Sequence, residues 1–186
     1  GRRLRVVREL YRLPSGREKE RVVIHPGDAA AMLPIEGDAC ILLRQFRFAI
    51  GKYLCEAPAG TVDPGETPLE AARRELIEET GLSGGRFIPR GFIYTTPGFT
   101  TEKIHLFEVR GLSHSADYSK DEDEEIEVVR VPASEVLAMA RDGRIRDAKT
   151  IALGDLGKGD SRSFEVALDG ECDRKYRVEV RPVEGS

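Results

Sequence analysis

The stretch GTVDPGETPLEAARRELIEETGL (residues 60–82) decides the fold, because it contains a helix whose two ends are both marked. Thr67 followed three residues later by Glu70 is a capping box, and Pro68 takes the first helical position, where no backbone donor is needed. Gly81 stands where a left-handed C-terminal cap is favoured. The stretch therefore predicts a helix that begins at Pro68 and ends just before Gly81.

This helix is predicted to have one apolar and one acidic face. One face of the helix can pack on a core, because its residues recur at steps of three and four: Leu69, Ala72, Leu76 and Thr80. Glu75, Glu78 and Glu79 project together from adjacent turns and repel one another. Such a face is usually solvated, but Arg74 is the only nearby cation that reaches one of the acids, Glu78. The helix alone leaves two interpretations open: a solvated face, or a site for a hard dication such as Mg²⁺, Mn²⁺ or Ca²⁺.

The whole stretch resembles a complete Nudix box, and so many specified positions make a chance match very rare. The match begins at Gly60, continues after five unspecified residues with Glu66 and after seven more with Arg74-Glu75-Leu76. It ends with Glu78-Glu79 and Gly81-Leu82, each pair preceded by one unspecified residue. The resemblance implies an α/β (α+β) fold, a Nudix-type α/β/α sandwich with a mixed sheet. It also implies an enzyme that uses Mg²⁺ or Mn²⁺ to hydrolyse a small-molecule nucleoside diphosphate substrate.

The resemblance assigns roles within the box. The expected metal ligands are Glu75, Glu78, Glu79 and the carbonyl of Ala59. Glu66 and Arg74 are expected to pin the preceding loop to the helix, and Gly60 and Gly81 are expected to be structural.

A second resemblance concerns the substrate. Pro97 lies sixteen residues after Gly81 in a Pro-Gly-Phe-x-x-Glu setting, which is similar to the ADP-ribose pyrophosphatase subgroup, as are RQFR at 44–47 and EAPAG at 56–60. By itself the loop at 95–102 reads as a turn or as a stacking wall for a nucleoside. The residues that the resemblance expects to contact ADP-ribose are Arg47, Glu56, Pro97, Gly98 and Glu102.

The segment 117–127, DYSKDEDEEIE, carries seven acidic side chains against one basic. Such a run is usually a solvated loop. The resemblance instead implies that Glu122 is the base acting on the attacking water and that Glu124 is a further metal ligand. Five consecutive acids at 121–125 leave that register open.

Composition sets limits on the class of protein. The chain has 186 residues, 40% hydrophobic and 33% charged, with a net charge of −4, which is typical of one globular domain with an appended element. The net charge argues against bulk nucleic-acid binding. No apolar run approaches the length of a membrane span, so we expect no membrane association and a cytoplasmic location. The three cysteines lack a C-x-x-C pair, which favours reduced thiols.

Strand patterns organise the rest of the chain. Expected strands are 4–13, 20–25, 28–35, 39–43, 86–95, 103–109 and 126–131, with helical segments at 134–141 and 147–153. Gly154, Gly157 and Gly159 are expected to break the last helix, after which 164–168 and 176–180 form a C-terminal β-hairpin. We therefore predict three parts: an N-terminal β-hairpin at 1–25, a Nudix domain at 26–153 and an extension at 154–186. The resemblance makes the first part a dimerisation element, and so implies a homodimer.

The predicted reaction is hydrolysis of ADP-ribose to AMP and ribose 5-phosphate. The box specifies diphosphate chemistry and not the flanking groups, so GDP-mannose or another nucleotide sugar is the alternative substrate. A non-catalytic sensor of ADP-ribose or NAD derivatives is a second alternative, although it would be expected to have lost box acids, and none is lost here.

Overall fold

The computed structural model describes residues 4–116, 126–156 and 179–182 of the chain. The described residues fall into two compact units. The larger unit contains residues 27–95, 102–116 and 126–156, and the small unit contains residues 4–26, 96–101 and 179–182.

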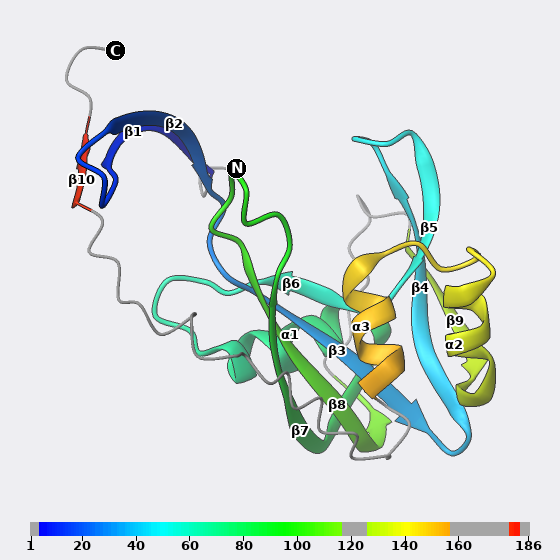
Figure 1. The fold of residues 1–186 in the computed structure, drawn as a ribbon. Coiled ribbons are helices and arrows are strands. Elements are labelled where there is room, and N and C mark those ends of the chain that lie inside the picture. Colours follow the sequence, from blue (N-terminus) through cyan, green and yellow to red (C-terminus); the bar gives the residue numbers. More distant parts are fainter. Residues whose placement is uncertain (1–3, 117–125, 157–178, 183–186) are drawn as a thin grey trace, which may run out of the picture. The chain divides into compact units, whose positions relative to one another are not determined.

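The larger unit is built on a seven-stranded sheet (Figure 1). Its strands are β3 (Ala29–Glu36), β4 (Ala39–Arg47), β5 (Lys52–Glu56), β6 (Ala59–Thr61), β7 (Leu82–Tyr94), β8 (Lys103–His114) and β9 (Ile126–Pro132). The main path runs β5-β4-β3-β8-β7, while β6 pairs with β3 and β9 pairs with β4. Because β3 and β8 are parallel and the other pairs are antiparallel, the sheet is mixed, as expected.

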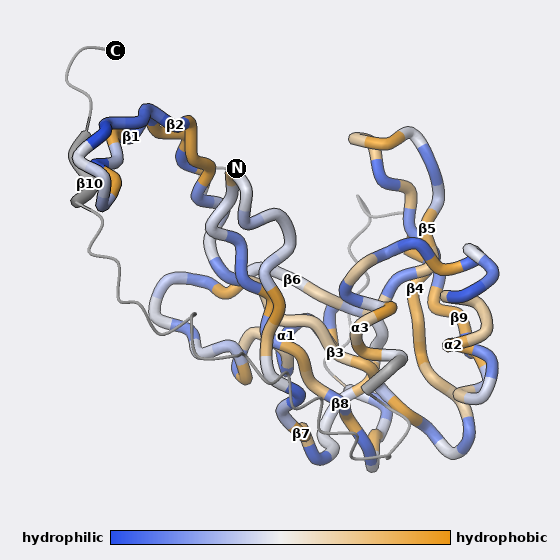
Figure 2. Tube along the Cα trace, viewed as in Figure 1, coloured by the Kyte–Doolittle hydropathy of each residue, from blue (hydrophilic) through white to orange (hydrophobic). Residues whose placement is uncertain are grey.

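Three helices cover the two faces of this sheet: α1 (Pro68–Thr80), α2 (Ala133–Arg141) and α3 (Ala148–Leu156). Successive residues of β3 point to opposite faces, so that Met32 packs with Leu76 of α1 while Leu33 packs in the cluster that contains Val136 of α2 and Leu153 of α3. Figure 2 shows the hydrophobic residues concentrated along the central strands β3 and β4. This arrangement confirms the predicted α/β/α sandwich.

Helix α1 has the predicted ends. The Thr67 hydroxyl accepts the Glu70 N–H at 3.3 Å and the Glu70 carboxylate accepts the Thr67 N–H at 2.7 Å, so both halves of the capping box form. Gly81 has φ +69° and caps the other end. The buried face differs from the prediction: Ala71 is buried beside Ala72 and Leu76, whereas Leu69 is 37% exposed. Leu69 lies in the first turn of the helix, one residue after Pro68.

Helix α3 departs from the prediction at Gly154, which lies inside the helix and does not end it. A Cβ on Gly154 would lie 3.0 Å from Cγ1 of Val136, so the missing side chain lets α3 approach α2 closely. Tight helix packing therefore outweighs the low helix propensity of glycine at this position. Gly157 and Gly159 lie outside the described residues.

The small unit is a three-stranded antiparallel sheet of β1 (Arg5–Arg12), β2 (Glu18–His25) and β10 (Glu179–Pro182), in the order β10-β1-β2. The predicted N-terminal hairpin is confirmed. The loop 96–101 adds to this unit: the Ile24 N–H donates to the Phe99 carbonyl at 2.8 Å, and the Thr101 N–H donates to the Ile24 carbonyl at 3.0 Å.

The predicted C-terminal hairpin is described only in part. Its second strand, expected at 176–180, overlaps β10, which pairs with β1. Residues 164–168 lie outside the described part, so the hairpin itself stays a prediction, as does the role of the N-terminal strands in dimerisation.

Two further expectations concern the thiols and the membrane. Cys40 and Cys55 are free, and burial raises the pKa of the Cys40 thiol to about 11, which suits an inert reduced cysteine. Within the described ranges, no helix has both the length and the apolar character needed to cross a bilayer.

Candidate active site

The acidic face of α1 lies directly against strand β6. A Cβ built on Gly60 would lie only 1.8 Å from Oε1 of Glu75, so the Glu75 carboxylate occupies the space that any other residue would need. One turn later along the helix, Glu79 Oε2 accepts the backbone N–H of Ala59 at 2.8 Å. Strand β6 is in turn held in the sheet, where Ala30 of β3 faces Gly60. Two of the three box acids are therefore fixed against one short strand.

Arg74 connects the loop, the strand and the acids. Its guanidinium binds both carboxylate oxygens of Glu66 at 3.0 Å and donates to the Thr61 carbonyl at 3.0 Å. Nη1 of the same group binds Glu75 Oε1 at 2.7 Å and Glu78 Oε2 at 2.9 Å. Hydrogen bonding to Glu66, and then to Glu75 and Glu78, raises the pKa of Arg74 far above its ordinary value against the opposing effect of burial. The group is a permanent cation that organises the box.

This network corrects one detail of the sequence analysis. Arg74 reaches two of the three acids, Glu75 as well as Glu78, because Nη1 lies between adjacent turns of the helix. Glu66 also accepts the Asp63 N–H at 3.0 Å, which ties the turn before the helix to the same arginine. The loop from 61 to 66 is thus fixed to α1 from both ends.

The donor set suits a hard dication, since carboxylate oxygens are the ligands that Mg²⁺ and Mn²⁺ prefer. The close fit of Glu75 against Gly60 also aims one carboxylate at β6, beside the Ala59 backbone. Among the described residues, however, no three acidic, histidine or cysteine side chains converge as a ready-made metal site. Glu75 and Glu78 are instead bonded to Arg74, so a dication bound by them would take over from this arginine. Glu122 and Glu124, the other acids proposed from the sequence, lie outside the described residues.

A second charged group lies between β4, β5 and α3. Glu56 is 2% exposed, and Arg47 binds it in a fork, with Nε 2.8 Å from Oε1 and Nη2 2.7 Å from Oε2. Lys149 Nζ lies 2.5 Å from the same Oε2. Burial is the largest influence on the Glu56 pKa and acts to raise it, but the bonds from Arg47 and the charge of Lys149 outweigh it, so this pKa lies below its ordinary value.

Arg47 links this group to the box. Hydrogen bonding to Glu56 is the main reason why the pKa of Arg47 is raised, and the charge of Glu79 adds to the effect. The Arg47 side chain is 41% exposed, whereas that of Glu56 is 3% exposed. Both residues were expected from the sequence to contact the substrate, and that expectation stays a prediction. The structure shows both Glu56 oxygens bonded to cations, so that Glu56 also holds Arg47 in place.

The remaining predicted substrate residues are divided between the two units. Glu102 belongs to the larger unit, where its carboxylate accepts the Thr95 hydroxyl at 2.5 Å. Pro97 and Gly98 belong to the small unit, where they line a cavity of about 500 Å³. Its other lining residues are Tyr11, Leu13, Lys19, Arg21, Val23, Phe99, Thr100 and Thr101.

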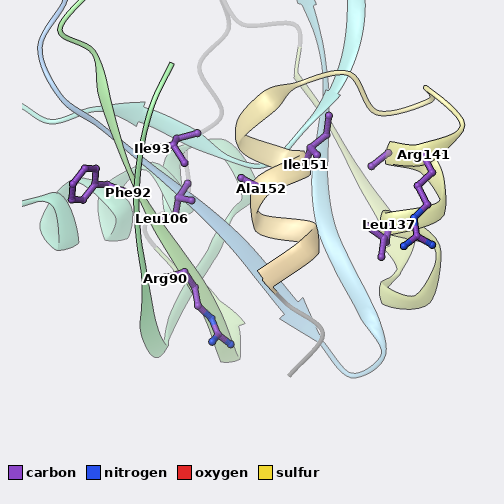
Figure 3. A pocket seen from close by; sticks show the side chains of 9 residues that line it. Arg90, Phe92, Ile93, Leu106, Leu137, Arg141, Ile151 and Ala152 are labelled. Atoms are coloured by element: carbon purple, nitrogen blue, oxygen red, sulfur yellow. The ribbon is translucent and has the colours of Figure 1, made fainter. Parts of the chain in front are cut away.

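A cavity of about 470 Å³ in the larger unit lies apart from the box (Figure 3). It lies on the α2 and α3 side of the sheet and is lined by Arg90, Phe92, Ile93, Leu106, Leu137, Ala140, Arg141, Ile151 and Ala152. No residue of the box lines it, because α1 covers the opposite face of the sheet.

Lys149 and its neighbours Asp147 and Thr150 were not predicted from the sequence as members of this charged group. Asp147 followed three residues later by Thr150 is a helix-start pattern, and Asp147 Oδ2 accepts the Thr150 N–H at 3.0 Å in the structure. That pattern marks the beginning of α3, but no local signal shows that Lys149 reaches a glutamate 93 residues earlier in the chain.

Comparisons with known proteins show what the chain as a whole is similar to. The NUDIX domain family matches residues 25–153. An ADP-ribose pyrophosphatase of Bacillus subtilis is 35% identical over 140 residues, which are 74% of this chain and 76% of that protein. A GDP-mannose pyrophosphatase of Cronobacter sakazakii is 42% identical over 144 residues, which are 72% of this chain and 75% of that protein.

A solved structure described as an ADP compounds hydrolase has the same fold. It superposes with a TM-score of 0.74 over 84% of this chain and 85% of its own, at 24% sequence identity. The box, its contacts and the family match lead to one conclusion. This chain belongs to the Nudix family of hydrolases, whose pyrophosphatase members act on small nucleoside diphosphate compounds and which in general need a divalent metal ion.

Proposed function

We propose that this protein hydrolyses the diphosphate bond of ADP-ribose, with Mg²⁺ or Mn²⁺, to give AMP and ribose 5-phosphate. The observation that carries the proposal is the fit of Glu75 against Gly60, with Glu79 bonded to the adjacent Ala59 N–H. This packing holds two of the proposed oxygen ligands, those of Glu75 and Glu79, beside strand β6. The Bacillus subtilis relative, whose name states ADP-ribose pyrophosphatase activity, supports the choice of substrate.

Oxygen atoms of Glu75, Glu78, Glu79 and the Ala59 carbonyl are the proposed metal ligands. A bound dication would offset the charge of the diphosphate and make its phosphorus more electrophilic. Arg47 is the proposed phosphate contact, because its guanidinium is partly exposed and is held in one orientation by Glu56. Glu102 is the proposed contact to the rest of the ADP-ribose, together with Pro97 and Gly98.

Glu122 is the proposed general base, and it would take a proton from the attacking water. Glu124 is proposed as a further metal ligand. Both assignments come from resemblance. The described chain resumes at Ile126, which lies opposite Gln45, two residues from Arg47 on strand β4.

The test is a substrate panel with identified products. ADP-ribose, GDP-mannose and other nucleoside diphosphate conjugates are incubated with the protein and Mg²⁺ or Mn²⁺, and the products are separated by ion-exchange chromatography. We expect AMP and ribose 5-phosphate from ADP-ribose, and we expect Glu79→Gln to lose this turnover while keeping its fold by circular dichroism. Equal turnover by Glu79→Gln would reject the proposed metal site.

GDP-mannose is the second candidate substrate, and one observation favours it. The Cronobacter sakazakii GDP-mannose pyrophosphatase has the higher sequence identity of the two relatives. A larger kcat/KM for GDP-mannose than for ADP-ribose, with GMP and mannose 1-phosphate as products, would replace ADP-ribose as the assigned substrate. Absence of nucleoside monophosphate from every compound with either metal would instead favour the sensor function.

We also propose that the protein is a homodimer that uses the strands of the small unit. This proposal rests on the family resemblance, and light scattering after size-exclusion chromatography measures the mass directly. A monomeric mass across the concentrations used for activity would overturn it.

A further inference from the structure

We infer that Lys149 is a positioning residue that sets the orientation of Arg47 through Glu56. Lys149 comes from α3, which contributes no residue to the Nudix box. The inference rests on the proposed function only where it speaks of substrate binding. Its structural part, the dependence of Arg47 on Lys149, stands on the contacts described below.

The Lys149 side chain is buried, and its ammonium group is bonded to two carboxylates. It is 8% exposed, and its ammonium lies 2.5 Å from Glu56 Oε2 and 3.0 Å from Asp147 Oδ1. A lysine is rarely so buried unless it is paired. Its position is therefore set by the protein interior and not by solvent.

The first turn of α3 fixes this lysine to the end of β5. Asp147 accepts both the N–H and the hydroxyl of Thr150, at 3.0 and 2.5 Å. Thr150, which is fully buried, accepts in turn the backbone N–H of Ala57 at 2.7 Å. Ala57 directly follows Glu56, so the helix start holds both the backbone and the carboxylate of this segment.

The charges along this path alternate. Asp147, Lys149, Glu56 and Arg47 form a chain of acid, base, acid and base, each bonded to the next. Without the ammonium, two carboxylates that now share it would face each other in a buried place with only Arg47 to balance them. We expect Glu56 to rotate away from Asp147 and to lose the forked geometry with Arg47.

This geometry matters because Arg47 has one guanidinium nitrogen left to donate a hydrogen bond to a ligand. Glu56 uses Nε and Nη2, and within the described part of the chain Nη1 makes no hydrogen bond. The guanidinium plane, and with it the direction of Nη1, is fixed by the fork. Lys149 therefore controls a phosphate contact that it does not touch.

The test reads Arg47 directly, without turnover. The Nε–H signal of Arg47 in a ¹H–¹⁵N spectrum, assigned by its loss in Arg47→Lys, reports the bond to Glu56. We expect Lys149→Met to shift and broaden this signal. In the same variant the KM for the hydrolysed nucleoside diphosphate should rise about tenfold while kcat changes less, because a binding contact is misplaced.

A second variant tests the charge argument. Lys149→Met/Asp147→Asn removes the repelling acid but keeps an oxygen to cap Thr150, so the Arg47 signal and the KM should return most of the way to wild-type values. A merely structural role for Lys149 predicts no such recovery. The double variant also keeps the test decisive if Lys149→Met alone does not fold.

The matched control is Arg90→Met, which removes a cation from another buried acid of the same unit, Glu108. It should lower the melting temperature without changing the Arg47 signal or the KM. An unchanged Arg47 signal in Lys149→Met would overturn the inference, as would the same change in Arg90→Met. If the wild type cleaves no compound of the panel, the proposed function fails, while the spectrum still decides whether Lys149 orients Arg47.

Discussion

The Glu75 carboxylate occupies the place where a side chain on Gly60 would begin, with its Oε1 1.8 Å from the position of a Cβ. The glycine is needed here for space, since its φ angle is not in the left-handed region. The atoms that would clash are the far end of a flexible side chain. A substitution at Gly60 is therefore accommodated by moving Glu75, so it impairs the proposed metal site more than the stability of the fold.

Gly60→Ala should reduce kcat by about 10²-fold or more, because it displaces a proposed metal ligand, while the melting temperature changes little. Turnover and thermal unfolding, measured on the same sample, separate the two effects. Gly154→Ala is the control, since its Cβ would meet Val136 in the α2–α3 contact; it should affect stability and leave turnover intact. Normal turnover by Gly60→Ala would contradict the position of Glu75.

Arg74→Lys should destabilise the protein by about 1–3 kcal/mol, because a single ammonium cannot reproduce the fork to Glu66 together with the bond to the Thr61 carbonyl. Urea unfolding measures the loss, and turnover should fall with it. Arg73→Lys, at the neighbouring exposed position, serves as the control and should be close to neutral. Equal stabilities of the two variants would show that the network around Arg74 contributes nothing.

Thr67→Ala should cost about 1 kcal/mol, which is the usual value of a helix N-cap, and lower the melting temperature by about 2–4 °C. The reason is that the Glu70 N–H loses its acceptor at the start of α1. Turnover at a temperature well below the transition should be unchanged, since Thr67 touches no proposed ligand. Calorimetry checks the prediction, and a loss greater than about 3 kcal/mol would point to a role beyond capping.

Acid should unfold the protein partly through Glu56 and Glu108. Burial acts to raise the pKa of each buried carboxyl, but Arg47 and Lys149 lower that of Glu56 below the ordinary 4.5, and Arg90 and Arg110 do the same for Glu108. A lowered folded-state pKa means that the stabilisation is complete above the ordinary value. It is lost as the pH falls below 4.5 and through the lowered pKa values.

Urea unfolding across this acidic range measures the slope of stability against pH. Glu108→Gln should be less stable than the wild type at neutral pH and should show a shallower slope in acid. An identical slope in the variant would mean that Glu108 is not among the carboxyls that take up protons on unfolding.

Glu122→Gln should lower kcat by about 10²–10⁴-fold without changing the melting temperature, as expected for loss of a general base. Glu127→Gln is the matched control from the same acidic stretch, because Glu127 is exposed and pairs with Arg44. Near-normal turnover by Glu122→Gln would transfer the role to a neighbouring acid between 121 and 125.

Sequence reasoning succeeded where the determinants are local. The capping box of Thr67 and Glu70 and the left-handed Gly81 involve residues within a few positions of one another, so the helix could be predicted to the residue. The buried face was predicted less well, because the choice of Ala71 over Leu69 depends on where the sheet lies.

The missed features depend on contacts between distant parts of the chain. Lys149 contacts Glu56 across 93 positions, and the Phe99 carbonyl in the loop 96–101 accepts the N–H of Ile24 in strand β2. Neither contact leaves a periodic or compositional signal. Gly154 is the opposite case, because here a local signal was misleading. Its low helix propensity predicted that the helix would end there, but packing against Val136 keeps the residue inside α3.

The small unit is assembled from three separate stretches of chain, with β1 and β2 first, the loop 96–101 next and β10 last. During translation the β1–β2 hairpin therefore leaves the ribosome long before β10, the strand that pairs with the other edge of β1. Until residue 182 has emerged, the edge of β1 that pairs with β10 is open. During that time a chaperone or a neighbouring polypeptide has access to this edge.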